Sequence, residues 1–195
     1  MKHKIKVAIF ISGKGTNALN LMHYFSNNST QEIALVFSTR QNEEMALACE
    51  TFGVNFFEHK TEMGDWSDLA LSVCKSHDID FIVLAGLLKK VTPHIIQAFP
   101  DRIINLHPSL LPKFGGKGMY GKYVHEAVIA SKEKKSGITI HFVNENFDEG
   151  KIIAQFETTV TENDDASSLP KKITALEMEN LPIVLSNLIS KNSAY

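Results

Sequence analysis

The sequence predicts an α/β protein with a Rossmann-like, mostly parallel twisted sheet, helices on both faces and an antiparallel pair of strands near the C-terminus. Strand-like and helix-like segments alternate through the first half, which is typical of parallel strands joined by crossover helices. A glycine turn, Gly13–Asn17, follows the first apolar run directly. Two β-rich runs in the second half are joined only by the loop Asn144–Gly150, which is too short for a crossover helix.

The parallel strands are predicted from segments that are rich in β-branched and aromatic residues. The predicted strands are Ile5–Ile11, Glu32–Phe37, Val54–Glu58, Asp80–Leu84 and Arg102–Leu106. Between them, apolar residues recur at helical spacing. The predicted crossover helices are Asn17–Ser26, Glu43–Phe52 and Asp65–His77.

The second half begins with a loop rich in proline and glycine, His107–Gly121, which has neither a helical nor a strand period. Long loops of this kind often carry function. A helix is predicted over Lys122–Ser131, followed by the antiparallel strands Gly137–Val143 and Lys151–Thr159. The last predicted helix, Ser167–Leu188, is interrupted by Pro170 and Pro182.

Length and composition predict one domain, residues 1–195, of an ordinary globular protein. The formal charge is −2 and 22% of the residues are charged, so no basic excess favours nucleic acid as a partner. The longest apolar run, Phe81–Leu88, is far shorter than the roughly 18 residues that a membrane-spanning helix needs. The N-terminal apolar run meets Gly13 too early for a signal peptide, so we expect a cytoplasmic protein.

The two cysteines predict no redox or metal chemistry. Cys49 and Cys74 lie in helical segments without CxxC spacing and without a histidine at ligand spacing. We expect buried, reduced thiols and no metal site.

The glycine turn, Ile11-Ser-Gly-Lys-Gly-Thr-Asn17, fits neither of the common nucleotide motifs. A dinucleotide site needs G-x-G-x-x-G and an acidic residue after the second strand, and a P-loop needs its lysine after the last glycine. What remains is an anion site made of backbone N–H groups and a helix N-terminus. We expect one phosphate to be held by Gly13, Lys14, Gly15, Thr16 and Asn17. In this interpretation Thr16 offers its hydroxyl and Asn17 caps the following helix. The alternative is a capped turn that binds no ligand.

A second group of polar residues lies at the end of the fifth predicted strand. Asn105 and His107 are two residues apart, so their side chains share one face of the strand, and Pro108 ends the ladder there. Asp148, in the loop between the last two strands, can orient the imidazole and stabilise its protonated form. No serine or cysteine nucleophile motif accompanies them. An amide, an imidazole and a carboxylate suit direct attack of an amine on a carbonyl, with hydrogen bonds to the tetrahedral oxyanion.

Four segments together resemble the phosphoribosylglycinamide formyltransferase family, which serves purine synthesis. They are ISGKGTN at 11–17, FIVLAGLL at 81–88, INLHPSLLPK at 104–113 and GITIHFVNENFDEG at 137–150. The resemblance covers nearly the whole chain. It implies an enzyme that passes the formyl group of 10-formyltetrahydrofolate, a cosubstrate, to the amine of glycinamide ribonucleotide without a metal.

The resemblance also implies roles for individual residues. Asn105 and His107 would stabilise the oxyanion, and Asp148 would position and charge His107 and assist proton transfer. Glu177 would lie near the substrate amine, and Gly13–Asn17 would take the ribose phosphate. Folate would be bound by residues that match the family's pterin pocket: Gly86, Leu87, Leu88, Lys89, Val91, Thr92, Val143 and Asn144.

The chain departs from the family pattern in three places. The segment Glu62–Trp66 lacks the arginine that reaches the substrate phosphate, and Lys14 or Lys117 is a candidate substitute. Lys89 replaces a common arginine. The segment Gly115–Gly121 lengthens the loop, as part of a substrate rim or as a plain surface loop.

Two alternatives stay open: a formyltransferase of the same fold with a sugar-nucleotide acceptor, and an inactive phosphoribosyl- or folate-binding module. The expected partners are small molecules, with no nucleic acid and no membrane, and the expected state is a monomer or homodimer.

Overall fold

The computed structural model describes residues 4–60 and 63–192, which fall into two compact units. The first unit runs to Ile103 and includes the chain from Leu188 onward, and the second is Ile104–Asn187. Residue Glu62 of the segment without the arginine lies outside the described residues. The single domain over residues 1–195 stays a prediction.

The first unit contains the parallel part of the sheet. Its strands follow the order β3-β2-β1-β4, and each neighbouring pair is parallel. The strands are β1 (Ile5–Ile11), β2 (Gln31–Ser38), β3 (Asn55–Glu58) and β4 (Phe81–Leu84), and the helices are α1 (Thr16–Phe25), α2 (Glu43–Phe52), α3 (Trp66–Ser76) and α4 (Pro93–Ala98).

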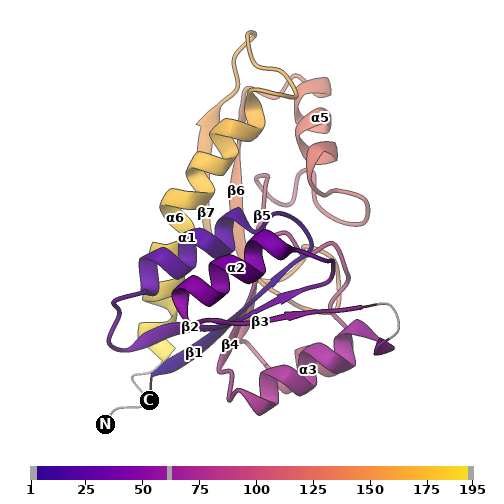
Figure 1. Ribbon diagram of the computed structural model, residues 1–195. Helices are drawn as coiled ribbons and strands as arrows, with labels where there is room; N and C mark the ends of the chain where they lie inside the picture. Colours follow the sequence, from indigo (N-terminus) through magenta and orange to yellow (C-terminus); the bar gives the residue numbers. More distant parts are fainter. Residues whose placement is uncertain (1–3, 61–62, 193–195) are drawn as a thin grey trace. The chain divides into compact units, whose positions relative to one another are not determined.

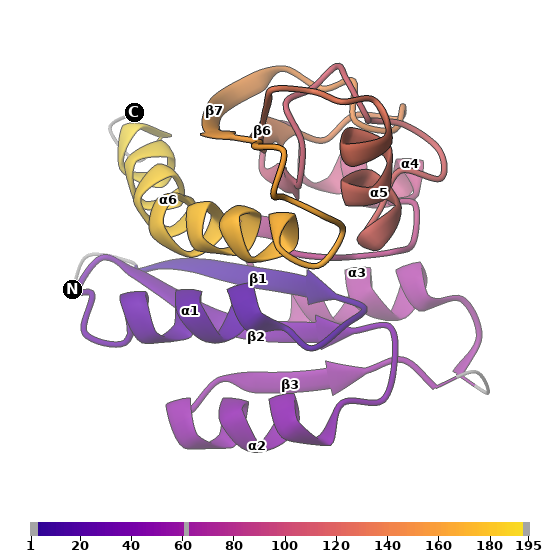
Figure 2. The same cartoon turned by 90° about the horizontal axis from the view of Figure 1, so that it is seen from above.

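Local sequence explains these elements. Residues Val7–Ile11 of β1 are fully buried, as expected for a central parallel strand. The buried face of α1 consists of Ala18, Leu21, Met22 and Phe25, which recur at helical spacing. Figures 1 and 2 show α1 and α2 on one face of these strands and α3 on the other. The predicted crossover helices are thus confirmed.

The short helix α4 is absent from the sequence prediction. Pro93 occupies its first turn, where the missing N–H costs nothing. Six residues are too few for a hydrophobic period to show, which is why the pattern of the sequence did not indicate it.

The second unit carries the antiparallel strands. The strand β5 (Ile103–His107) begins at the last residue of the first unit, and Ile82 of β4 donates its N–H to the carbonyl of Arg102, just before β5. Strand β6 (Lys135–Phe142) pairs antiparallel with both β5 and β7 (Ile152–Thr159). The predicted fold class, a mixed and mostly parallel sheet with an antiparallel C-terminal pair, is confirmed.

Two helices complete the second unit, α5 (Lys122–Ala130) and α6 (Leu169–Asn192), and α6 ends in the first unit. We predicted a final helix interrupted by prolines, but α6 continues through Pro182. Pro170 lies in the first turn, where proline is tolerated, and Pro182 removes only one backbone hydrogen bond from a long helix.

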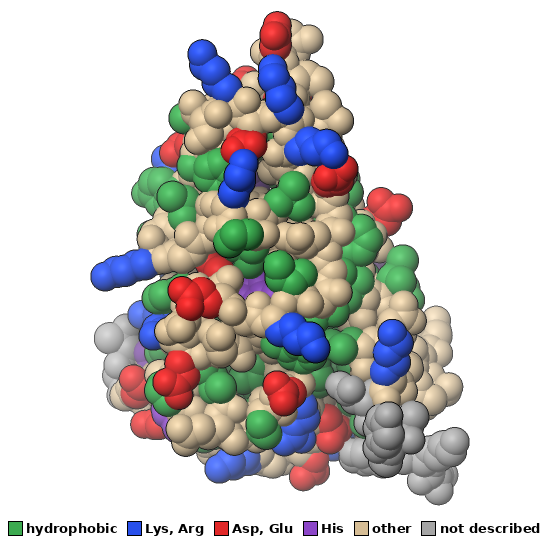
Figure 3. Space-filling model, turned by 180° about the vertical axis from the view of Figure 1, so that it is seen from behind, with side chains coloured by type: hydrophobic (Ala, Val, Ile, Leu, Met, Phe, Trp, Pro, Cys, Tyr) green, Lys and Arg blue, Asp and Glu red, His purple; other side chains and the backbone are tan. Residues whose placement is uncertain are grey.

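Charged side chains of both signs are interspersed on the face that Figure 3 shows. That distribution agrees with the small formal net charge of −2. Within residues 4–60 and 63–192, no helix combines the length and the apolar character needed to cross a membrane.

Candidate active site

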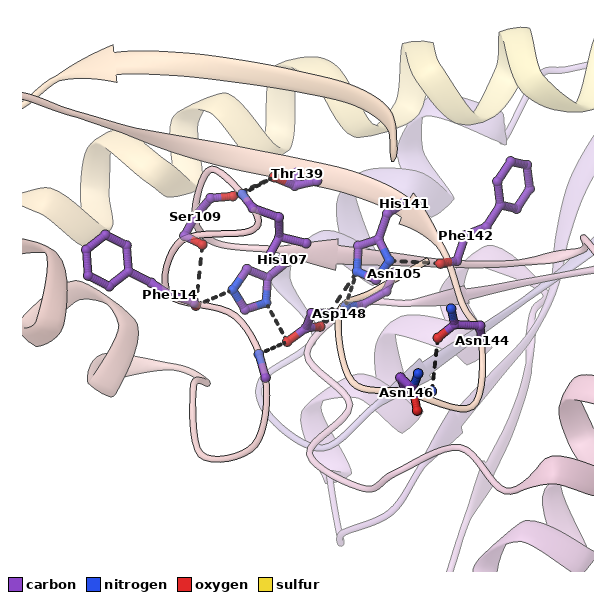
Figure 4. A network of polar contacts seen from close by, with 12 residues as sticks. Asn105, His107, Ser109, Phe114, Thr139, His141, Phe142, Asn144, Asn146 and Asp148 are labelled. Carbon is purple, nitrogen blue, oxygen red and sulfur yellow. Dashed lines mark hydrogen bonds and ion pairs between the residues drawn. The ribbon is translucent and has the colours of Figure 1, made fainter. Parts of the chain in front are cut away.

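Asn105, His107 and Asp148 come together in the second unit, as the sequence predicted (Figure 4). Asn105 and His107 occupy alternate positions of β5, and the antiparallel register sets them opposite His141 and Thr139 of β6. Asp148 follows from the loop after β6. Pairing of β5 with β6 therefore assembles the cluster from segments that lie far apart in the sequence.

The carboxylate of Asp148 is the centre of the cluster. Its Oδ2 accepts a hydrogen bond from the N–H of Gly116 at 2.8 Å and lies 3.5 Å from Nδ1 of His107. Its Oδ1 accepts from the Asn105 amide at 3.3 Å and lies 3.6 Å from Nε2 of His141. Each oxygen thus has one hydrogen-bond donor and one imidazole ring nearby.

The partners of His107 determine where its proton lies. Nε2 is 2.8 Å from the carbonyl oxygen of Phe114, which can only accept, so Nε2 carries the hydrogen. A neutral His107 therefore directs the lone pair of Nδ1 toward Asp148. One further proton would fit between Nδ1 and Oδ2, and the pair would then be an imidazolium and a carboxylate.

Burial decides which form is present. His107 is 3% exposed, and this burial lowers its pKa; the charge of Asp148 and the bond to Phe114 raise the pKa by less. Burial raises the pKa of Asp148, but the His141 and His107 rings and the Gly116 N–H outweigh it and leave that pKa below its usual value. Neutral His107 beside ionised Asp148 is thus the state favoured at neutral pH.

His141 fixes the amide of Asn105. Its Nδ1 donates to the carbonyl of Phe142 at 2.8 Å, so its Nε2 is free to accept from the Asn105 amide at 3.1 Å. Gly150 permits this arrangement, because a Cβ at that position would overlap the Phe142 carbonyl. Gly150, the last residue of the Asp-Glu-Gly segment, is thus required for this position of His141 and Phe142.

The turn after His107 is anchored on a fully buried hydroxyl. Thr139 accepts from the N–H of Leu111 at 3.0 Å and donates to the carbonyl of Ser109 at 2.7 Å. Gln155 of β7 donates to both Thr139 and the Leu111 carbonyl, at 2.9 Å each. The proline-containing turn is therefore held rigidly against β6 and β7.

Two non-glycine residues that contact His107, Phe114 and Asp148, have a backbone φ of 57°. This left-handed conformation is unfavourable for most residues and clusters at functional sites. The first glycines of the long loop join them, since Gly116 donates to Asp148. The segment Gly115–Gly121 is therefore part of the cluster at its beginning.

The predicted phosphate turn lies in the first unit, where Gly13, Lys14 and Thr16 are exposed. The predicted capping is wrong in one respect: Gly15, in the left-handed region, is the N-cap of α1, and no side chain caps the helix. The φ of 79° favours glycine at this corner, and a Cβ at Gly15 would require the end of the Met45 side chain to move. The carbonyl of Gly13 accepts from the Asn42 amide at 2.9 Å.

The predicted folate residues fall in both units. In the first, Gly86, Leu88 and Lys89 are exposed, Leu87 and Thr92 are half-buried, and Val91 is buried. In the second, Val143 and Asn144 follow β6, and the side chain of Asn144 accepts from the N–H of Asn146, which shapes the loop toward Asp148 (Figure 4). Glu177 lies half-buried in α6. The ligand roles of all these residues stay predictions.

Sequence reasoning missed His141 and Thr139, which looked like isolated polar residues of a strand. Their signal is the antiparallel register with β5, which places them opposite Asn105 and His107. Within the part of the chain that the structure describes, no three His, Cys, Asp or Glu side chains form a group suited to a metal ion.

The fold and the cluster define a Rossmann-like α/β protein in which a buried imidazole meets a half-buried amide and a half-buried carboxylate at the end of a strand. The profile of the formyl transferase family matches residues 5–185. The chain belongs to the formyl transferase family, and the resemblance drawn from its sequence is confirmed.

Several relatives carry a more specific name. A chloroplastic phosphoribosylglycinamide formyltransferase of Arabidopsis thaliana is 39% identical over 86% of this chain. Phosphoribosylglycinamide formyltransferase of Haemophilus influenzae is 30% identical, with 92% of this chain and 85% of the relative covered. The crystal structure of the enzyme of that name from Bacillus halodurans has a TM-score of 0.84 and 32% identity, and 96% of each chain is covered.

The chain spans only part of some relatives. It covers 60% of the Arabidopsis thaliana protein and 55% of the chloroplastic protein of Vigna unguiculata. The Haemophilus influenzae and Bacillus halodurans proteins are covered over most of their length.

Proposed function

We propose that the protein transfers the formyl group of 10-formyltetrahydrofolate to the amine of 5'-phosphoribosylglycinamide, a step of de novo purine biosynthesis. The observation that carries this proposal is the contact of Asn105 and His107 with Asp148, in one largely buried cluster that has room for one more proton. The names of the relatives support the acceptor. The partners would be small molecules, and no metal takes part in the proposed chemistry.

The first step is attack of the neutral amine on the formyl carbon. A C–N bond forms and the carbonyl oxygen becomes an oxyanion. The Asn105 amide stabilises it by turning toward it one of the two hydrogens that it otherwise donates to His141 and Asp148. The attacking nitrogen becomes acidic as it gains positive charge. Neutral His107 then takes its proton at Nδ1, where Asp148 stabilises the imidazolium.

The second step returns that proton. The oxyanion reforms the carbonyl and the bond to N10 of the folate breaks. The proton held between His107 and Asp148 passes to N10, so that tetrahydrofolate leaves as a neutral amine. Protonated His107 thus exists only while the oxyanion does, which reconciles the role expected from the sequence with a lowered pKa.

The remaining predicted residues would bind the two substrates. The exposed glycine turn Gly13–Asn17 would take the ribose phosphate through backbone N–H groups at the start of α1. The segment Gly86–Thr92, with Val143 and Asn144, would contact the folate. Glu177 would accept a hydrogen bond from the substrate amine.

A substrate comparison tests the proposal. Purified protein is mixed with 10-formyltetrahydrofolate and glycinamide ribonucleotide, an amino-sugar nucleotide, or no acceptor, and tetrahydrofolate release is followed. We expect release only with glycinamide ribonucleotide. Release only with the sugar nucleotide would establish the alternative acceptor, and no release with either would support a binding module.

Matched variants locate the chemistry. Asp148→Asn keeps the size of the side chain but removes the charge, and we expect turnover to fall by roughly 10²- to 10⁴-fold. Glu157→Gln makes the same chemical change at an exposed position of β7 and should leave turnover unchanged. Equal rates for the two variants would contradict the role of Asp148.

A further inference from the structure

Ser12, the residue before the glycine turn, connects that turn to the predicted folate segment. Ser12 is 3% exposed, and its hydroxyl accepts a hydrogen bond from the N–H of Leu88 at 2.9 Å. Its own N–H donates to the carbonyl of Gly86 at 3.1 Å. All of these residues belong to the first unit.

The Ser12 hydroxyl continues into a directed chain of hydrogen bonds. Its Oγ lies 2.6 Å from the hydroxyl oxygen of Thr39, at the end of β2, and Thr39 donates onward to the carbonyl of Ile11 at 3.5 Å. Because Thr39 uses its hydrogen there, Ser12 donates to Thr39. The order is therefore Leu88 N–H to Ser12, Ser12 to Thr39, and Thr39 to Ile11, and each bond polarises the next.

Backbone contacts also join the ends of three strands, β1, β2 and β4. The N–H of Thr39 donates to Ile11 at 3.0 Å, and the turn is held from α2 by Asn42. The two segments on either side of Ser12 are exposed, at Gly13 and at Gly86. Ser12 and Thr39, whose hydroxyls connect to these segments, are themselves buried.

We propose that Ser12 and Thr39 are positioning residues that couple binding of the phosphorylated substrate at Gly13–Asn17 to binding of the folate at Gly86–Thr92. The inference rests on the proposed function. The first ligand to bind orders the segment that the second requires, so the second binds more tightly. By linkage, each ligand strengthens the other by the same factor.

The coupling factor is the dissociation constant of glycinamide ribonucleotide alone divided by that constant in saturating tetrahydrofolate. Titration calorimetry measures both. We expect a factor of about five or more in the wild-type protein. In Thr39→Val, which keeps the volume but removes the hydroxyl, we expect a factor near one, and Thr39→Ser should restore it.

The outcomes separate the two proposals. Wild-type protein that binds both ligands with a factor of one overturns the coupling and leaves the proposed function intact, as does an equal factor in Thr39→Val and Thr39→Ser. Wild-type protein that binds neither ligand overturns the proposed function, and the coupling falls with it.

A measurement on the wild-type protein does not depend on any variant folding. Amide hydrogen exchange at Leu88 is followed with and without glycinamide ribonucleotide alone. We expect exchange at Leu88 to slow when this ligand binds, because Leu88 donates to Ser12. Unchanged exchange at Leu88 while the ligand is bound would overturn the inference.

Discussion

His107 and Asp148 face each other across 3.5 Å, from Nδ1 to Oδ2, while Nε2 of the same ring is bound to the Phe114 carbonyl. This geometry leaves one place for a proton, between the ring and the carboxylate. Burial keeps that place empty at neutral pH, because it lowers the pKa of His107 by more than Asp148 raises it. The pair can thus receive one proton, and the proposed addition of an amine to a carbonyl would release one.

The first prediction concerns the pH dependence of this pair. We expect kcat/KM to fall on acidification with an apparent pKa below the ordinary histidine value of about 6.5, because in the proposed mechanism only neutral His107 accepts the proton. In Asp148→Asn the pKa of His107 should fall further, since the carboxylate that raises it is gone. NMR titration of the His107 ring measures that pKa directly.

The same shift affects stability. The pKa of His107 is lower in the folded protein than in the unfolded chain, so the unfolded chain binds a proton first on acidification. The free energy of unfolding therefore decreases as pH falls below about 6.5. A His107 pKa above 6.5 in the wild-type protein, or a higher one in Asp148→Asn, would contradict the assignment.

The second prediction concerns Thr139. Replacing Thr139 by Val keeps the volume but leaves the buried N–H of Leu111 without its acceptor. We expect a loss of about 1–3 kcal/mol in the free energy of unfolding, measured by urea denaturation. The control Thr159→Val, at an exposed position of β7, should change the stability by less than about 0.5 kcal/mol. Equal effects would show that the buried hydroxyl does not anchor the turn.

Periodicity accounts for most of the fold that the sequence predicted. Strands of the first unit are apolar runs and their helices carry a clear stripe, so both types of element were found. The sequence did not predict helix α4 or the continuation of α6 through Pro182, because neither leaves a periodic signal of its own. Their stability comes from packing that the linear pattern does not contain.

The candidate site, like the fold, was predicted from the sequence only in part. Strand alternation was enough to place Asn105 and His107 on one face. The contacts of His141 and Thr139 depend on the register of β5 against β6, and that of Phe114 depends on a left-handed backbone conformation in the long loop. These are tertiary properties, so residue types and spacing could not indicate them.

The third prediction concerns the two cysteines. Burial raises the pKa of Cys49 to about 11 and that of Cys74 to about 12. Because the thiolate is the reactive form, we expect both to resist a thiol reagent in the folded protein at pH 8 and to react at once in denaturant. Since the unfolded thiols ionise first, the free energy of unfolding should also decrease as pH rises above about 9. Rapid labelling of the folded protein would contradict this.

The last prediction compares two glycines with the same backbone conformation. Gly15 and Gly53 both adopt the left-handed region, with φ of 79° and 68°. A Cβ at Gly53 would meet open space, whereas a Cβ at Gly15 would lie 2.5 Å from Cε of Met45. Gly53→Ala should therefore cost only the conformational penalty of about 1–2 kcal/mol. Gly15→Ala should cost more, and it should also weaken binding of ribose 5-phosphate.

A double-mutant cycle isolates the steric part. Met45→Ala removes the atom that a Cβ at Gly15 would meet, at the cost of a cavity of its own. If crowding by Met45 causes the excess loss, Gly15→Ala should cost clearly less in the Met45→Ala background than in the wild-type background, although Cδ1 of Ile11 still lies 3.2 Å from the position of the Cβ. An excess that persists in the double variant would show that Gly15 is required for a reason other than its contact with Met45.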